Sequence, residues 1–252
     1  MTLEKLAARL DTAARAVQSI AQLSEKESIS LEEAYQIQRL SVDRRLARGE
    51  RLTGIKLGFT SVAKMQQMGV NDLIWGRLTD KMAIPTNGKL RMSEYIHPRA
   101  EPEIAFLLQS PLRGAMNESA IRAAVGSVAV ALEIIDSRYQ NFKFSLEDVV
   151  ADNCSSAAYA IGPWLPANQP IEDVPIALSI DGQIVHEGSS SAILGNPWKS
   201  MYAAARILAE NDIELAAGSI ILAGAATPAV YHSPGQTVTA AASGLGAVTI
   251  FS

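Results

Sequence analysis

The stretch Glu101-Pro102-Glu103-Ile104-Ala105-Phe106-Leu107-Leu108 joins two carboxylates to a run of strongly β-forming residues. Side chains alternate between the two faces of a strand, so Glu101 and Glu103 are expected on the same face. Neighbouring carboxylates on one strand face repel each other unless a positive group lies between them, and a divalent cation meets that need. The alternative is a solvated start of a strand, which Pro102 would tolerate.

A second apolar stretch, VAVALEIID at residues 128–136, has the composition of a buried strand and holds one carboxylate near its end, that of Glu133. Burial of an isolated carboxylate is so costly that Glu133 must be ion-paired, protonated or metal-bound. A structural ion pair is one alternative. With Glu101 and Glu103, however, Glu133 completes a set of three hard oxygen ligands, which suits Mg²⁺ or Mn²⁺ with open positions for water and substrate.

Three basic residues are candidate neighbours of these carboxylates. Lys56 lies in GIKLG at residues 54–58, an expected strand whose glycines allow close approach of another backbone. This lysine is either an extended surface side chain or a buried partner for anions. Arg99 precedes Glu101 by two residues on the expected strand face, and Arg138 follows Glu133 closely, so both are candidates for charges beside the ligands.

Composition and spacing exclude several classes of protein. The chain has 252 residues, 48% hydrophobic and 19% charged, with a net charge of -4 and no basic run, so one or two globular domains and no nucleic-acid partner are expected. No stretch approaches the roughly 18 apolar residues of a membrane span, and the N-terminus is amphipathic, which favours a cytoplasmic protein without a membrane partner. The three histidines lack the spacing of a zinc motif, and no serine-hydrolase motif occurs.

The single cysteine, Cys154, excludes an intramolecular disulfide and a cysteine-rich metal site. No histidine lies near it in the sequence, so a structural thiol is favoured over a nucleophile.

Local patterns predict an N-terminal helical segment, residues 1–50, followed by a β-rich catalytic domain, residues 51–252. Apolar spacing indicates a helix from Leu3 to about Val17, and the capping box from Ser30 to Glu33 begins a second helix that ends near residue 48. The stretches 62–68 and 73–78 look helical and suggest a lid-like segment over residues 61–82. The later elements are a hairpin around Asp181-Gly182, a helix from Pro197 to about Asn211, and three strands that follow glycines. These three strands are expected at residues 218–224, 235–242 and 246–252.

Several of these motifs together resemble the fumarylacetoacetate hydrolase superfamily, in its hydratase and decarboxylase branch. The motifs are EPEIAF at 101–106, ALEIIDSR at 131–138 and VADNCSS at 150–156. The stretches 56–82 and 222–230 look like those of the decarboxylases in this branch. The resemblance covers most of the chain.

This resemblance implies an α+β fold, with the N-terminal helical segment joined to a mixed β-sheet roll of the fumarylacetoacetate hydrolase C-terminal domain type. It implies a metal, Mg²⁺ or Mn²⁺, held by Glu101, Glu103 and Glu133, and a catalytic lysine at Lys56. Asp152, Ser155 and Thr227 fall in motifs that line the family's substrate pocket. Relatives are typically homo-oligomers, and the decarboxylases are expected to associate with vinylpyruvate (2-oxopent-4-enoate) hydratase.

The activity that the resemblance implies is decarboxylation of 2-oxohex-3-enedioate to CO₂ and the dienol of 2-oxopent-4-enoate, in the meta-cleavage route of catechol degradation. Related hydratases carry an acidic residue where Ile74 stands, and an apolar side chain there would exclude water from the distal end of the substrate. Asp72 is an alternative acid, since a one-residue shift of the segment would bring its carboxylate to that place. The rival activities are a 2-oxopent-4-enoate hydratase, a carbon-carbon hydrolase for acylpyruvates, and a non-catalytic partner subunit of the hydratase.

Overall fold

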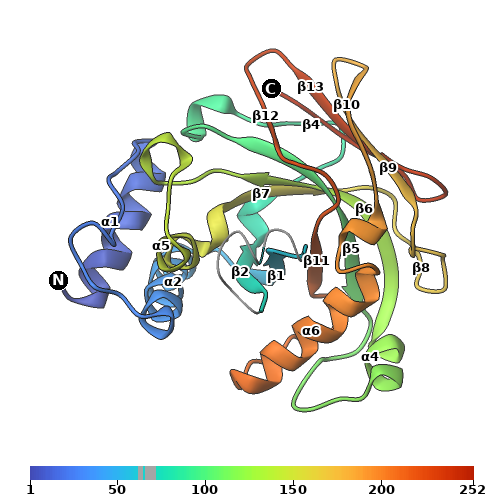
Figure 1. Cartoon of the computed structure of the whole chain (residues 1–252), viewed down its shortest axis with the longest axis horizontal. Coiled ribbons are helices and arrows are strands. Elements are labelled where there is room, and N and C mark those ends of the chain that lie inside the picture. Colours follow the sequence, from blue (N-terminus) through green and yellow to red (C-terminus); the bar gives the residue numbers. More distant parts are fainter. Residues whose placement is uncertain (62–64, 66–71) are drawn as a thin grey trace.

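A nine-stranded mixed sheet forms the centre of the molecule in the computed structural model, which describes residues 1–61, 65 and 72–252 (Figure 1). Its main path runs β2-β1-β11-β5-β6-β7-β3, while β12 pairs with β5 and β8 with β6. Its strands are β1 Leu52–Gly58, β2 Ile74–Thr79, β3 Ala83–Ile84, β5 Arg99–Leu108, β6 Val125–Ile135, β7 Ser156–Ile161, β8 Leu165–Pro166, β11 Ile220–Ala225 and β12 Val230–Tyr231.

A smaller, five-stranded sheet packs against one face of the large sheet and runs β10-β9-β13-β14-β4. Asp181 and Gly182 both have positive φ in the turn between β9 and β10, as a tight hairpin requires, so the predicted hairpin is confirmed. The strands are β4 Gly88–Lys89, β9 Pro175–Ile180, β10 Gln183–Ser189, β13 Thr237–Ala242 and β14 Gly246–Phe251. The three predicted C-terminal strands correspond to β11, β13 and β14 and are confirmed.

Two of the predicted helices begin where their caps place them. The Ser30–Glu33 capping box forms, and Asn196 caps a helix whose first residue is Pro197. The described α-helices are α1 Leu3–Ala16, α2 Leu31–Leu46, α4 Glu118–Ala124, α5 Leu146–Ala151 and α6 Pro197–Glu210. Short 3₁₀ turns cover Asp80–Met82, Met92–Glu94, Gln140–Phe142, Asn153–Ser155 and Ser190–Ala192. No helix within residues 1–61 and 72–252 has both the length and the apolar character needed to cross a membrane.

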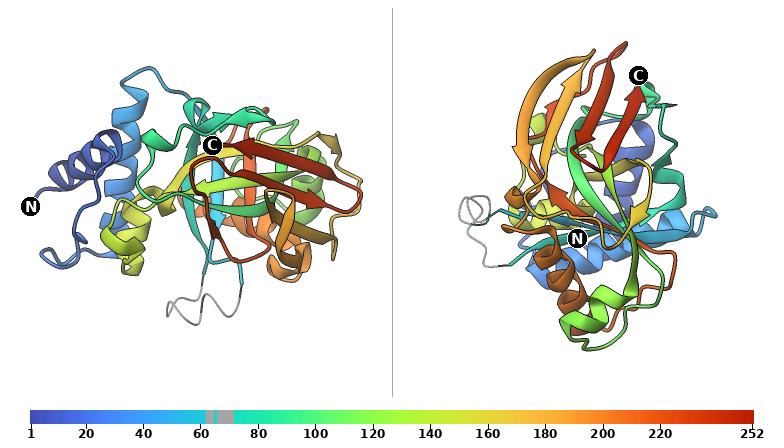
Figure 2. Two further views of the ribbon diagram at one scale, coloured as in Figure 1. Left: turned by 90° about the horizontal axis from the view of Figure 1, so that it is seen from above. Right: turned by 90° about the vertical axis from the view of Figure 1, so that its right-hand side faces the viewer.

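The N-terminal helices α1 and α2 lie at one end of the molecule, away from the small sheet (Figure 2). The connection between them is fastened to α5, because the Asp148 carboxylate accepts hydrogen bonds from the backbone of Leu23 and Ser24 and from the Ser24 hydroxyl. Helices α1, α2 and α5 share an apolar core with Ile74 of the large sheet. The division of the chain into 1–50 and 51–252 stays a prediction.

The two faces of the large sheet carry different side chains. On β5 and β6, Ile104, Phe106, Val130 and Leu132 face the small sheet and α6, where they form the main core. The opposite face carries smaller residues such as Ala105 and Ala131, with Leu222 on β11. Because side chains alternate along a strand, Glu101, Glu103 and Glu133 lie on this second face.

The predicted helix at 73–78 is wrong, because residues 74–79 are strand β2, paired with β1. Ile74 packs toward the N-terminal helices and Trp75 toward the main core, so both faces of this strand are buried. A strand buried on both faces reads as a continuous apolar run, which periodicity alone does not distinguish from a helix. The lid-like segment over 61–82 stays a prediction, because residues 62–64 and 66–71 lie outside the described residues. All of the predicted 62–68 helix except Met65 lies outside them as well.

Candidate metal centre

Three carboxylates converge on the face of the large sheet that points away from the small sheet. The register of β5 with β6 places Glu101 opposite Glu133, and Glu103 lies two residues further along β5 on the same face. One oxygen from each of the three lies within 4.8 Å of the other two. Glu103 and Glu133 are fully buried, and Glu101 is half-buried. The structure thus brings the three candidate ligands together.

Lys56 completes the cluster from strand β1. Its Nζ lies 2.8 Å from Oε2 of Glu133, and its side chain is buried. Burial alone would lower the pKa of Lys56, but attraction to Glu133, Glu101 and Glu103 outweighs it and raises the pKa above its ordinary value. Lys56 is therefore an ammonium ion. Of the two interpretations of this residue, a surface side chain and a buried partner for anions, the structure supports the second.

Glu103 is the carboxyl group on β5 that is fully buried within the cluster. Burial, followed by repulsion from Glu133 and Glu101, raises its pKa well above the ordinary value. Its Oε2 accepts a hydrogen bond of 2.7 Å from the backbone N–H of Gly224. In the described part of the chain, its Oε1 is buried without a hydrogen-bond partner, and Glu133 has no polar partner besides Lys56.

The donor set fits a divalent cation with a preference for oxygen ligands. Three carboxylates and one ammonium leave a formal charge of -2, which a dication neutralises. The buried carboxylate oxygens without hydrogen-bond partners offer the hard ligands that Mg²⁺ and Mn²⁺ take. The assignment of Glu101, Glu103 and Glu133 as metal ligands remains a prediction, which this geometry supports.

Gly224 is a residue that the sequence reasoning missed, although it lies inside the recognised 222–230 stretch. It has a φ of +110°, and a Cβ built on it would lie 2.1 Å from Oγ1 of the buried Thr60. Only glycine therefore lets β11 bring this N–H to Glu103 without moving Thr60. The signal in the sequence that could have identified it was a glycine inside the 222–230 stretch, which also holds Thr227.

We expect Gly224→Ala to lower Mg²⁺ affinity, because relief of the clash with Thr60 must displace the N–H that orients Glu103. A factor of roughly 10 to 100 is typical for loss of a group that orients a metal ligand. Isothermal titration calorimetry measures the change. Gly218→Ala is the matched control, since Gly218 also has positive φ but its Cβ would meet open space. Equal losses in both variants would show that backbone strain, and not the contact with Thr60, causes the effect.

Asp152 and Arg138 form a buried ion pair. The carboxylate of Asp152 accepts from both the backbone N–H and Nε of Arg138, and burial raises the pKa of Asp152 to about 6. This pair holds the 3₁₀ turn that follows, in which Asn153, Cys154 and Ser155 all have positive φ. The proposed substrate contact of Asp152 stays a prediction, and its engagement with Arg138 favours a positioning role.

The same turn carries Ser155 and Cys154. The hydroxyl of Ser155 is buried and has no hydrogen-bond partner among the described residues, which supports its prediction as a substrate ligand. The thiol of Cys154 donates to the carbonyl oxygen of Trp75, and burial raises its pKa to about 12. A thiol with so high a pKa is a poor nucleophile, in agreement with the expected structural role.

Ile74 and Asp72 occupy different environments. Gly76 of β2 lies opposite Lys56 and Ile74 lies opposite Gly58, so Ile74 shares the sheet face of Lys56. Ile74 is buried, whereas Asp72 is exposed and forms a bidentate ion pair with Arg206 of α6. The register therefore favours Ile74 over Asp72 as the side chain at the site, and the catalytic assignment of Asp72 stays a prediction without support from this contact.

Thr227 lies in the loop between β11 and β12, and Arg99 is the first residue of β5. The backbone of Ala226 donates to the carbonyl oxygen of Pro102, so the loop with Thr227 lies beside the ligands. The guanidinium of Arg99 is stacked between Phe142 and Tyr231, at 4.0 and 4.3 Å from their ring centroids, and donates to the Tyr231 hydroxyl. Substrate binding by Thr227 and by Arg99 remains a prediction.

Sequence comparisons relate the chain to two kinds of enzyme. Residues 61–250 match the family described as fumarylacetoacetate (FAA) hydrolase, C-terminal. A 4-oxalocrotonate decarboxylase from a Pseudomonas species is 46% identical over 249 residues, which cover 99% of this chain and 97% of the relative. A 2-keto-4-pentenoate hydratase from Paraburkholderia phymatum is 35% identical over 252 residues, which cover 98% of this chain and 95% of the relative.

A solved structure shows the same fold over nearly the whole chain. It is a 4-oxalocrotonate decarboxylase from Pseudomonas putida G7, complexed with magnesium and adipate. The TM-score is 0.94 at 34% sequence identity, with 99% of this chain and 96% of the other covered. The expected helical segment joined to a mixed β-sheet roll is therefore confirmed.

Proposed function

This chain belongs to the fumarylacetoacetate hydrolase family, and from this premise we propose that it decarboxylates 2-oxohex-3-enedioate (4-oxalocrotonate) with the aid of Mg²⁺ or Mn²⁺. The similarity to decarboxylases at 46% identity makes the chain an enzyme of the carboxy-lyase class. The observation that carries the proposal is the cluster of three carboxylates and the buried Lys56, with an apolar residue, Ile74, on the same sheet face. The product is the dienol of 2-oxopent-4-enoate, in the meta-cleavage degradation of catechols.

The reaction needs an electron sink at the 2-oxo group. A divalent cation held by Glu101, Glu103 and Glu133 would supply Lewis-acid polarisation of that group. As the bond between C5 and the distal carboxylate breaks, its electrons shift through the conjugated system to the 2-oxo oxygen, and CO₂ leaves. One proton on the resulting oxygen gives the dienol, so no organic cofactor is needed.

Lys56 and Ile74 have separate roles in this proposal. The ammonium of Lys56 offsets the excess negative charge of three carboxylates and a dianionic substrate. Donation of the proton to the dienolate is a second role that we propose for it. The apolar Ile74 excludes water, and a carboxylate that loses its charge as CO₂ benefits from less polar surroundings. The hydroxyls of Ser155 and Thr227 are proposed to orient the substrate.

The second candidate is hydration of 2-oxopent-4-enoate, because a hydratase of this substrate class is 35% identical over almost the whole chain. A non-catalytic subunit that stabilises a hydratase is a third. Retention of the glutamates and of Lys56 favours an active enzyme over that subunit. We also propose a homo-oligomer that associates with the hydratase that consumes the unstable product.

The deciding experiment supplies 2-oxohex-3-enedioate and 2-oxopent-4-enoate separately to the Mg²⁺-loaded protein. We expect CO₂ from the first and little 4-hydroxy-2-oxopentanoate from the second. Rapid hydration of the second without CO₂ from the first would contradict the decarboxylase and support the hydratase. Turnover of neither substrate would favour the non-catalytic subunit.

A further inference from the structure

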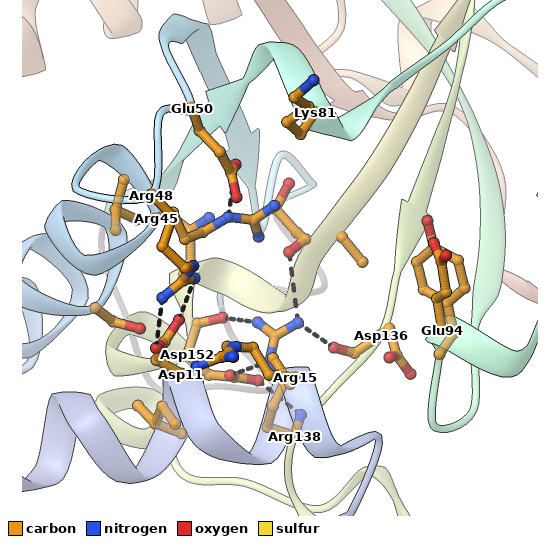
Figure 3. Close-up of a pocket in the computed structure, with 18 of the residues that line it drawn as sticks. Asp11, Arg15, Arg45, Arg48, Glu50, Lys81, Glu94, Asp136, Arg138 and Asp152 are labelled. Carbon is orange, nitrogen blue, oxygen red and sulfur yellow. Dashed lines mark hydrogen bonds and ion pairs between the residues drawn. The ribbon is translucent and has the colours of Figure 1, made fainter. Parts of the chain in front are cut away.

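A separate cavity of about 370 Å³ lies between the N-terminal helices and the edge of the large sheet, and none of Glu101, Glu103 and Glu133 lines it (Figure 3). Its walls come from α1, α2, the 3₁₀ turn at Asp80–Met82, the loop around Tyr95, and the start of β7. We call it the helix cavity. Six basic side chains and five carboxylates line it.

The carboxylates of the helix cavity already have partners. The Asp11 carboxylate accepts hydrogen bonds from Arg48 and Arg44. The Glu50 carboxylate accepts hydrogen bonds from Arg45 and from the Thr79 hydroxyl. These pairs leave the acidic groups little capacity to receive a cationic ligand.

The remaining three carboxylates are likewise occupied. Asp136 accepts two backbone N–H groups, from Ile96 and His97, and Asp152 accepts from Arg138. Glu94 is ion-paired with Arg91. Figure 3 shows the pairs of Asp11, Glu50 and Asp152 as dashed lines along the walls.

Donors, in contrast, are in excess. Within the described residues, Arg15 and Lys81 form no hydrogen bond and no ion pair, and Arg45 bonds to Glu50 through Nε alone. Ser156 lines the same cavity and is 2% exposed, and its hydroxyl has no hydrogen-bond partner in the described part of the chain. A buried hydroxyl without a partner is uncommon in a folded protein and indicates a missing ligand or water.

We propose that the helix cavity binds a small oxyanion with at least two negative charges, of the chemical class shared by phosphate and short dicarboxylates. Such an anion accepts several charge-assisted hydrogen bonds at once, which matches free guanidinium and ammonium donors around a buried hydroxyl. Arg15 and Lys81 supply the charge, and Ser156 and Arg45 supply further donors. The proposal does not depend on the reaction proposed above.

The location gives binding a structural consequence. Arg15 and Arg45 belong to α1 and α2, whereas Lys81 and Ser156 belong to the β-rich part, so a bound anion joins the two. The floor of the cavity includes Asp152 and Asn153, in the turn that also carries Ser155. Because the anion would bind the folded form only, it should raise the melting temperature in a saturable manner.

The test uses the whole 252-residue chain, stripped of metal with EDTA. Sodium phosphate, sodium sulfate or sodium succinate is added in increasing concentration, and sodium chloride keeps the ionic strength constant. Sodium chloride alone serves as the reference. We expect at least one of the three divalent oxyanions to raise the melting temperature saturably and to give a binding isotherm in calorimetry. A response to phosphate and sulfate but not succinate identifies a phosphate-type site. The converse identifies a dicarboxylate site.

Variants distinguish anion binding in the helix cavity from anion binding at the metal centre. Arg15→Gln and Lys81→Gln should each weaken the anion about tenfold, the factor that corresponds to ~1.4 kcal/mol. The matched control is Arg113→Gln, an exposed arginine outside the cavity, and Glu103→Gln must also leave anion binding unchanged. No stabilisation by any anion beyond that of chloride, or wild-type affinity in both cavity variants, would overturn the proposal.

Discussion

Glu103→Gln is expected to abolish tight Mg²⁺ binding and to reduce decarboxylation to a small fraction of the wild-type rate. Glutamine keeps the size of the side chain, and its amide oxygen accepts the hydrogen bond from Gly224 in place of Oε2. The –NH₂ group then stands where Oε1 would hold the cation. The loss should exceed the roughly 10- to 100-fold that removal of a partner of a metal ligand costs, because a charged ligand itself is lost.

Calorimetry with Mg²⁺ and a CO₂-release assay measure the two effects of this variant. Glu118→Gln, on the exposed side of α4, removes the same charge far from the triad and should behave like the wild type. The variant should fold, because the pKa of Glu103 is already raised by burial and repulsion, so that a neutral side chain is tolerated. Unchanged Mg²⁺ affinity with full activity would refute the assignment of the triad.

Lys56→Met is expected to lower kcat by a factor of about 10² to 10⁴, the range that a positioned proton-transfer group contributes. Methionine fills much of the buried volume but removes the ammonium that lies 2.8 Å from Glu133. The charge of the dianionic substrate is then no longer offset, and the dienolate loses its proposed proton donor. Steady-state kinetics at saturating Mg²⁺ measure this loss.

Thermal denaturation with and without Mg²⁺ distinguishes catalysis from folding in the same variant. Without metal, Lys56→Met leaves the buried Glu133 unpaired, and breaking a buried pair costs about 3–5 kcal/mol of stability. With Mg²⁺, the cation compensates Glu133, so the melting temperature should return close to that of the wild type. Lys89→Met, at an exposed position, controls for loss of a charge. Normal kcat, or failure to fold even with Mg²⁺, would point to a structural lysine.

Features that depend on local chemistry could be predicted from the residues alone. A period of two places Glu101 and Glu103 on one strand face, whatever the strand pairs with. The cap of Ser30 and Glu33 and the turn at Asp181-Gly182 act within a few residues, so the elements that they begin or connect were predicted correctly. The cost of an isolated buried charge indicated that Glu133 needs a partner before any neighbour was known.

Which distant groups meet depends on long-range packing and could not be predicted in this way. The β5–β6 register brings Glu133 opposite Glu101, and packing of β1 beside β11 brings Lys56 and the Gly224 N–H to the carboxylates. Residues 73–78 also look helical locally, yet residues 74–79 form a strand because β1 pairs with one edge while apolar cores cover both faces. Strand pairing and the contact of α1 with the roll join residues far apart along the chain, and no short-range pattern encodes such pairings.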